Sequence, residues 1–318
     1  MPDYSASSMG SLLVFIHGIG GPRDAERERA GWIAALVEGA RRAGHSAVAA
    51  TLSASVDIRF VDYSDLMASA GAQGFGGEIL DDEADFLCGL VATLLDELAE
   101  DADDQPTRRA ITEARAQLSG EGGQGVGAPV RMLGAALTAT LQIPGLRRAS
   151  QWASGLRLLG ALAQVGRYLR RGELEDGCTL DERVRARVLA ALPPDRSAVV
   201  VAHSLGSVVA FEALHAHSGP VSLLVTLGSP LTTAAVVLHR VRPTPLRTPL
   251  TVERWLNFWD RDDIVVARPK LDRRIAANAF GVLPVSNRVD SDGVWVHTAT
   301  KYLAQPAVAG PIVEAYHG

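Results

Sequence analysis

Residues 199–211 read VVVAHSLGSVVAF, a β-branched run followed by His-Ser-Leu-Gly and a second apolar run. A short apolar run that ends at a turn signal is typical of a buried strand. The small residues after the turn suit a helix that packs close to that strand. The stretch therefore predicts a strand, a sharp turn carrying Ser204, and a helix. Ser204 either caps this helix or presents its hydroxyl for chemistry.

The rest of the chain alternates between strand and helix candidates. Apolar and β-branched runs predict strands at residues 11–16, 46–52, 57–62, 198–202, 221–227 and 252–258. One helix carries an apolar face from Trp32 and is expected to stop at Gly44, and another opens at Thr179 with Glu182 completing a capping box. This alternation predicts an α/β fold with a mostly parallel sheet and helices on both faces.

The composition excludes several classes of protein. The chain has 318 residues, 47% of them hydrophobic and 21% charged, which is ordinary for a globular protein, and its net charge of -5 gives no reason to expect nucleic-acid binding. Its two cysteines have no metal or redox spacing, which favours a reducing compartment. The start of the chain lacks a basic leader, and the longest uncharged segment, 132–146, is shorter than the ~20 apolar residues of a spanning helix. We expect a cytoplasmic protein.

Five motifs together resemble the α/β-hydrolase superfamily. They are HGIGG at 17–21, AHSLG at 202–206, TLGSPL at 226–231, the aspartate turn at 260–263 and a late histidine at 297. The chain is most similar to serine lipases and esterases, including bacterial lipases and the inositol-deacylase-like group. Their nucleophile lies in a G-x-S-x-G turn, and here Ala202 replaces the first glycine. The resemblance covers 11–36 and 180–306 but not 64–177.

The resemblance implies the chain order serine, acid, histidine, and a base must take the serine proton. Two of the histidines after Ser204 belong to the helix that follows it, one precedes a Pro-rich turn, and one lies next to the end of the chain: His215, His217, His239 and His317. His297 remains as the predicted base. The alternative is that His297 caps the helix that starts after it.

The acid is expected at a strand end between Ser204 and His297. VERWLNFWDRDDIVVA, residues 252–267, offers Asp260, Asp262 and Asp263 there. Asp263 directly precedes an apolar run and matches the D-x-V position of the inositol-deacylase-like group, so we expect it to orient the imidazole. The three carboxylates are alternatively a solvated turn or a cation site, although no further cluster of metal ligands lies nearby in the sequence, and we expect no metal.

An oxyanion formed during acyl transfer needs two N–H donors. The resemblance places one on Leu205, directly after Ser204, and the other on Ile19 in the HGIGG loop. The glycines of that loop permit close backbone approach. His17, Gly18 and His203 are expected to contact the substrate.

The domain boundaries follow from the long separation of the oxyanion loop from Ser204. We expect residues 1–63 and 178–318 to form the core and 64–177 to form a helical cap or lid. Within this insertion a helix is expected at 82–100. The Gly-rich segment 119–129 contains the sequence pattern G-x-G-x-x-G, but no predicted strand precedes it. This favours a linker over a phosphate-binding loop.

Residues 130–171 carry seven arginines and no carboxylate beside an apolar stripe. They form either a fixed cap with its arginines in solvent or a mobile lid that contacts an anionic membrane.

The sequence thus predicts a serine hydrolase of carboxylic esters, with a lipid or another apolar acyl ester as substrate and no cofactor. Thioester or amide cleavage and acyl transfer use the same residues. A non-catalytic interaction module with this fold is the alternative from another class. The sequence does not indicate the oligomeric state.

Overall fold

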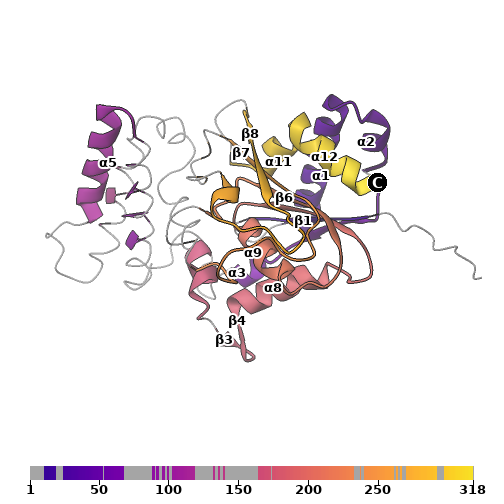
Figure 1. Cartoon of the computed structure of the whole chain (residues 1–318), viewed down its shortest axis with the longest axis horizontal. Coiled ribbons are helices and arrows are strands. Elements are labelled where there is room, and N and C mark those ends of the chain that lie inside the picture. The colour runs from indigo at the N-terminus through magenta and orange to yellow at the C-terminus, as the bar shows by residue number, and fades with distance from the viewer. Residues whose placement is uncertain are drawn as a thin grey trace, which may run out of the picture.

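The computed structural model describes most of the core and parts of the insertion (Figure 1). The described residues are 11–18, 24–52, 54–67, 102–118, 164–172, 174–232, 237, 240–260, 263, 266, 270–291 and 297–317, with short pieces at 88–89, 91–92, 95–96, 99, 132, 135–136 and 139.

The core is a six-stranded sheet in which every neighbouring pair of strands is parallel. The strand order is β2 (Ile58–Val61), β1 (Leu12–Ile16), β5 (Ala198–His203), β6 (Val221–Leu227), β7 (Trp255–Asp260) and β8 (Pro284–Val289). All six residues of β5 are buried, as a strand covered on both faces requires. The predicted α/β fold with a mostly parallel sheet is therefore confirmed.

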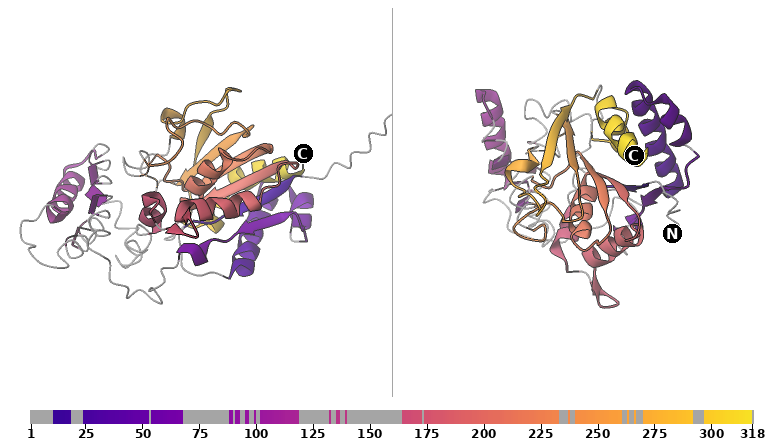
Figure 2. Two further views of the ribbon diagram at one scale, coloured as in Figure 1. Left: turned by 90° about the horizontal axis from the view of Figure 1, so that it is seen from below. Right: turned by 45° about the vertical axis from the view of Figure 1, so that its right-hand side comes forward.

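Helices cover both faces of this sheet (Figures 1 and 2). One face carries α1 (Ala25–Arg42), α2 (Ser46–Leu52), α11 (Ala299–Leu303) and α12 (Pro306–His317), and the other carries α3 (Ser64–Met67), α8 (Leu180–Ala190) and α9 (Leu205–Leu214). Each face has its own apolar core because alternate residues of each strand point to opposite sides. Every residue of α9 is buried, so this helix lies wholly inside the protein.

Local signals set the ends of the helices as expected. Asp24 accepts a hydrogen bond from the Arg27 N–H at the start of α1, and Gly44 follows its end with φ of 92°, a conformation that favours glycine. At the start of α8 the Thr179 N–H donates to Glu182 Oε2 at 2.8 Å, which belongs to the predicted capping box.

The structure corrects two strand predictions and adds one strand that the sequence did not indicate. Residues 46–52 form helix α2, whose buried Ala49 and Leu52 are three positions apart, so the apolar positions follow a helical period and the alanines favour that state. The strand predicted at 252–258 is β7 at Trp255–Asp260, because Val252 forms only an isolated bridge with Val221. Strand β8 was missed because an edge strand with polar and exposed positions lacks an apolar run.

Only part of the predicted insertion is described. Helix α5 (Gln105–Leu118) lies apart from the sheet in Figures 1 and 2, and the short pieces between 88 and 99 are helical. A two-stranded hairpin, β3 (Leu174–Glu175) and β4 (Cys178–Thr179), precedes α8. The Gly-rich segment 119–129 and most of 130–163 lie outside the described residues, so the predictions for them remain predictions.

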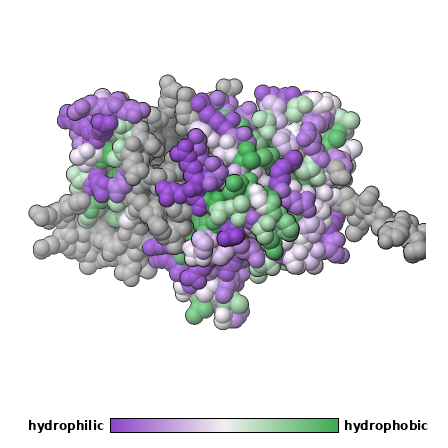
Figure 3. Space-filling view, viewed as in Figure 1, coloured by the Kyte–Doolittle hydropathy of each residue, from purple (hydrophilic) through white to green (hydrophobic). Residues whose placement is uncertain are grey.

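The described surface mixes polar and apolar residues. On the face drawn in Figure 3, hydrophobic residues gather in patches toward the middle among hydrophilic ones. Large exposed apolar side chains on the described surface include those of Phe280 and Leu250. Within the part of the chain that the structure describes, no helix combines the length and apolarity needed to cross a bilayer.

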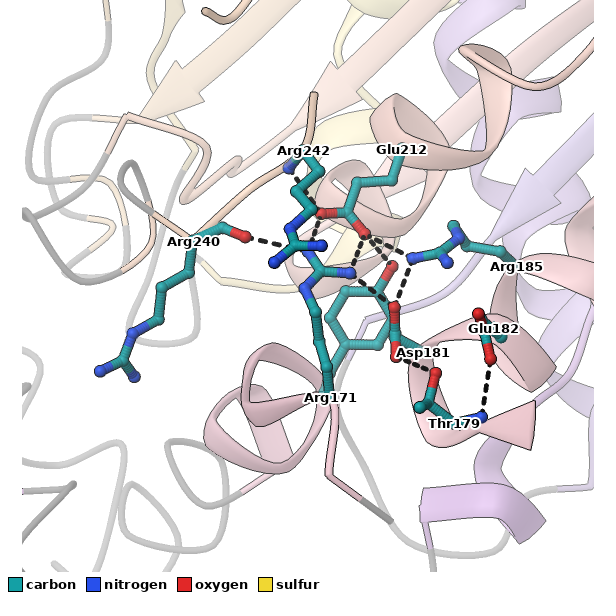
Figure 4. Close-up of polar contacts among 9 residues, drawn as sticks. Arg171, Thr179, Asp181, Glu182, Arg185, Glu212, Arg240 and Arg242 are labelled. Atoms are coloured by element: carbon teal, nitrogen blue, oxygen red, sulfur yellow. Dashed lines mark hydrogen bonds and ion pairs between the residues drawn. The ribbon is translucent and has the colours of Figure 1, made fainter. Parts of the chain in front are cut away.

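A buried ion cluster ties the end of the insertion to α9 (Figure 4). The Arg171 guanidinium donates to Asp181 Oδ2 and to Glu212 Oε1, each at 2.5 Å, and Arg185 bridges the same two carboxylates. Tyr168 donates its hydroxyl hydrogen to Glu212 Oε2 at 2.7 Å. Because Glu212 lies on the helix that follows Ser204, this cluster fixes the position of that helix against residues 164–172.

Candidate active site

Ser204 lies in a sharp turn between β5 and α9, at the carboxyl edge of the sheet. Its backbone has φ of 54° and ψ of -131°, a conformation that L-residues rarely adopt. Gly206, two residues after Ser204, lies directly against the end of β1: a Cβ atom there would lie 2.3 Å from the His17 carbonyl oxygen. Ala202, in place of the glycine of the related motif, is fully buried. The local sequence therefore produces a strained elbow that presents the Ser204 side chain.

The structure brings Ser204, His297 and Asp263 together, although His297 lies 93 positions after Ser204 and 34 positions after Asp263 in the sequence. His297 Nε2 lies 2.9 Å from Ser204 Oγ, and His297 Nδ1 lies 2.7 Å from Asp263 Oδ2. All three residues are buried, with 3%, 7% and 2% of their surface exposed for Ser204, His297 and Asp263. A proton on Nδ1 that donates to the carboxylate leaves the Nε2 lone pair facing the serine hydroxyl.

The neighbouring aspartates are placed differently. Asp260, the last residue of β7, accepts a hydrogen bond from the Ser291 N–H at 2.5 Å and its own N–H donates to Tyr302. The turn after the strand is closed by the Asp263 N–H, which donates to the Asp260 carbonyl at 3.1 Å. Asp262 lies outside the described residues. Of Asp260 and Asp263, Asp263 is the carboxylate bonded to the imidazole.

The other candidate bases lie elsewhere. His215 directly follows α9 and its Nδ1 bonds the Phe211 carbonyl at 2.8 Å, while His317 ends α12. Burial lowers the pKa of His217, which lies two residues beyond His215. His239 lies outside the described residues.

Of the two expected oxyanion donors, Leu205 and Ile19, the structure describes Leu205. Leu205 is the first residue of α9, where backbone N–H groups lack partners within the helix. Gly18 lies against the elbow, since a Cβ atom on residue 18 would come within 2.6 Å of the Ser204 Cβ and 3.2 Å of its Oγ. Ile19, the other expected donor, lies outside the described residues. The HGIGG loop therefore begins in contact with Ser204.

His17 and His203 pack against other residues of the site. The His17 ring is 1% exposed, stacks on Tyr63 with centroids 4.1 Å apart, and bonds Asp62, whose pKa the His17 hydrogen bond holds far below its usual value. His203 packs its ring against that of His297 at 4.7 Å. The predicted substrate contacts of His17, Gly18 and His203 remain predictions.

Three residues that the sequence did not indicate surround the site. Gly228, with φ of 54°, passes so close that a Cβ there would lie 2.7 Å from Asp263 Oδ2 and 3.1 Å from His297 Nδ1. The Ser207 hydroxyl donates to the Ser204 carbonyl at 2.6 Å and is bonded to the Ser229 hydroxyl at 2.7 Å. The motif TLGSPL contains both Gly228 and Ser229, but no local pattern specified what they contact.

Tyr302 is a fourth residue that the sequence did not indicate. It is fully buried, and its hydroxyl donates to Asp263 Oδ2 at 2.7 Å. Burial raises the pKa of Tyr302 well above its usual value, and the Asp263 charge and hydrogen bond raise it further, so the phenol remains a donor.

Among the described residues, no group of three or more histidine, cysteine, aspartate or glutamate side chains could hold a metal ion.

The fold and the site together define an α/β protein with a six-stranded parallel sheet and a buried Ser–His–Asp arrangement at the carboxyl edge of its strands. Comparison with known protein families, curated proteins and solved structures found no match.

Proposed function

We propose that the chain is a serine hydrolase that cleaves carboxylic esters through an acyl-enzyme. The observation that carries the proposal is the pair of contacts made by His297, to Ser204 Oγ at 2.9 Å and to Asp263 Oδ2 at 2.7 Å. A nucleophile bonded to a base that is itself held by a carboxylate is the arrangement that acyl transfer requires. The strained turn under Ser204 supports the same function, because such strain persists mainly at functional sites.

The proposed first step forms the acyl-enzyme. His297 Nε2 takes the Ser204 proton while Oγ bonds to the ester carbonyl carbon, and the carbonyl π electrons move to its oxygen. The N–H groups of Leu205 and Ile19 would donate to that oxyanion. When the intermediate collapses, the alcohol leaves and takes the proton from Nε2. Asp263 stabilises the imidazolium in between.

The second step releases the acid by the same residues. A water molecule gives a proton to Nε2 as its oxygen attacks the acyl carbon, and the proton returns to Ser204 Oγ when the acyl group leaves as a carboxylic acid. Thioesters and amides react through the same steps, and an alcohol in place of water gives acyl transfer. We propose apolar acyl esters as the substrates because the insertion is rich in leucine, alanine and glycine.

Residues 64–177 are proposed to form a cap over this site. Arg167 Nη1 donates to the Met67 carbonyl at 2.5 Å, so the two ends of the insertion lie side by side on the face of the sheet that carries α9. A segment that leaves and rejoins the core at one place can fold as a separate layer. Contact of residues 130–171 with an anionic membrane remains the alternative role of this cap.

The decisive test is labelling with a fluorophosphonate probe. Such probes phosphonylate a serine only when a neighbouring base activates it, so a hydrolase will label at Ser204 and an interaction module of the same fold will not. Ser204→Ala should abolish the label and lower the turnover of p-nitrophenyl esters by several orders of magnitude, because triad members act as a unit. Retention of a tenth of the wild-type turnover would contradict the assignment.

A further inference from the structure

The carboxylate of Asp263 is held by two donors on a single oxygen atom. His297 Nδ1 and the Tyr302 hydroxyl both lie 2.7 Å from Asp263 Oδ2. The side chains of Asp263 and Tyr302 are buried, so water cannot replace either donor.

The Tyr302 hydroxyl is also fixed in direction. Its oxygen accepts a hydrogen bond from the Asp260 N–H at 3.1 Å, and its hydrogen points at Asp263. The hydroxyl therefore joins the end of β7 to the turn residue Asp263 three positions further on. Helix α11, which begins two residues after His297, supplies Tyr302, so the base and the tyrosine approach the carboxylate from one short segment.

We infer that Tyr302 is a positioning residue of the proposed hydrolase: its hydroxyl holds the Asp263 carboxylate in the orientation that supports His297. The inference rests on the proposed function. A carboxylate at a turn can rotate about its Cβ–Cγ bond, and a second fixed donor restricts that rotation. The donor also draws negative charge toward itself and away from the imidazole.

The groups around the His297 imidazole determine how the reaction rate depends on pH. Among the described residues, His297 contacts Asp263 and Ser204 and packs on the His203 ring, while Asp260 lies behind Tyr302. Removing the Tyr302 hydroxyl leaves more negative charge facing the imidazole. The imidazolium is then favoured up to a higher pH, and the base is available over a narrower range.

The test compares Tyr302→Phe with a matched control. Tyr168 is also fully buried and also donates its hydroxyl hydrogen to a buried carboxylate at 2.7 Å, that of Glu212, away from the site. Each variant removes one hydroxyl. Hydrolysis of p-nitrophenyl butyrate and the rate of fluorophosphonate labelling are measured against pH, with unfolding in urea as the check on folding.

For Tyr302→Phe we expect kcat to fall by about 10- to 100-fold, which corresponds to one hydrogen bond to a charged group, with little change in KM. The low-pH limb of the rate profile should move to higher pH. Tyr168→Phe should keep the wild-type profile whatever its stability. An unchanged kcat and profile in a folded Tyr302→Phe variant would overturn the inference.

A second variant keeps the packing and changes only the strength of the donor. Replacing Tyr302 by 3-fluorotyrosine makes the phenol more acidic and its hydrogen bond to Asp263 stronger. The low-pH limb should then move in the opposite direction, to lower pH, whereas a tyrosine that only fills space would leave it in place. Wild-type protein that does not label would remove the proposed function, and this inference with it. Labelling of the wild type with no effect of either variant would remove the inference alone.

Discussion

Gly18 lies so close to Ser204 that a Cβ atom on residue 18 would come within 2.6 Å of the serine Cβ and 3.0 Å of the His203 carbonyl oxygen. Two chain segments far apart in the sequence thus meet at Ser204 without space for a methyl group. The backbone after β1 can contribute an oxyanion donor only if it keeps this approach.

Gly18→Ala should therefore impair both activity and stability. Displacing the loop removes the donor expected from it, and loss of one oxyanion donor typically lowers kcat by about 10²–10³. Overpacking should lower the free energy of unfolding by about 1–3 kcal/mol. Gly31→Ala is the matched control, because a Cβ on residue 31 of α1 meets nothing within 4 Å. Equal ester turnover in the two variants would contradict the close approach as a functional feature.

The backbone strain at Ser204 predicts a difference between two inactive variants. Ser204→Ala keeps a Cβ at φ of 54°, whereas Ser204→Gly removes it. Relief of such strain should raise the free energy of unfolding by about 1–3 kcal/mol. The greater conformational entropy of glycine in the unfolded chain offsets part of this gain. Ser204→Gly should thus have a free energy of unfolding above that of Ser204→Ala, although both lack activity. Equal urea midpoints for the two would argue against stored strain.

The aspartates of the turn should separate in activity. Asp263→Asn should lower kcat by about 10²–10⁴, because an amide fails to stabilise the imidazolium and favours the wrong tautomer. Asp260→Asn should have a smaller effect, since Asp260 accepts from the Ser291 N–H and is not bonded to His297. A greater loss of ester turnover in Asp260→Asn than in Asp263→Asn would show that the acid is misassigned.

The buried ion cluster predicts a pH-dependent stability. Burial by itself raises the pKa of Asp181. Hydrogen bonds from Thr179 and Arg185 and the charges of Arg185 and Arg171 lower it by more than burial raises it, so the pKa lies below the ordinary 3.8. The stabilisation is complete above the unfolded pKa and is lost as the pH falls through the lower folded pKa. Arg171→Met should lower the free energy of unfolding in urea by about 3 kcal/mol at pH 7, because it leaves two buried carboxylates sharing the single guanidinium of Arg185.

That difference between the wild type and Arg171→Met should shrink below about pH 4, as the Asp181 carboxyl takes up a proton. The exposed Arg109–Glu113 pair of α5 provides the control. Arg109→Met should lower the free energy of unfolding by less than about 1 kcal/mol at both pH 7 and pH 3. A constant difference from pH 7 to pH 3 would contradict this account.

The insertion is expected to act as a fixed wall. Two of the seven arginines of 130–171 are already bonded: Arg167 donates to the Met67 carbonyl, and Arg171 donates to Asp181 and Glu212 of the core. Neither guanidinium can therefore lie on a membrane without breaking these contacts. Ester hydrolysis should therefore proceed at equal rates with and without anionic vesicles. Activation by anionic but not neutral vesicles, weakened by salt and by Arg170→Glu, would instead support a mobile lid.

Local patterns in the sequence were sufficient for the fold class and the elbow. The buried run before Ser204, the small residues on both sides of it and the alternation of strands with helices depend on neighbours in the chain, and periodicity reports them. The choice of His297 and Asp263 also came from the sequence, through a chain order that the resemblance implied. Helix α2 was misassigned because five of its seven residues are apolar, and a segment this short does not separate the helical period from the strand period.

Only the tertiary structure decided which side chains support those residues. Tyr302 five positions after His297 is indistinguishable in the sequence from an aromatic residue of the core, and its hydroxyl has a role only because α11 packs beside the end of β7. Gly228 and Gly18 are likewise ordinary turn glycines until the order of β1, β5, β6 and β7 brings their backbones against His297, Asp263 and Ser204. The physical reason is that a hydrogen bond or a close approach depends on atoms a few ångströms apart in space, and the parallel sheet sets those distances between residues that are remote in the chain.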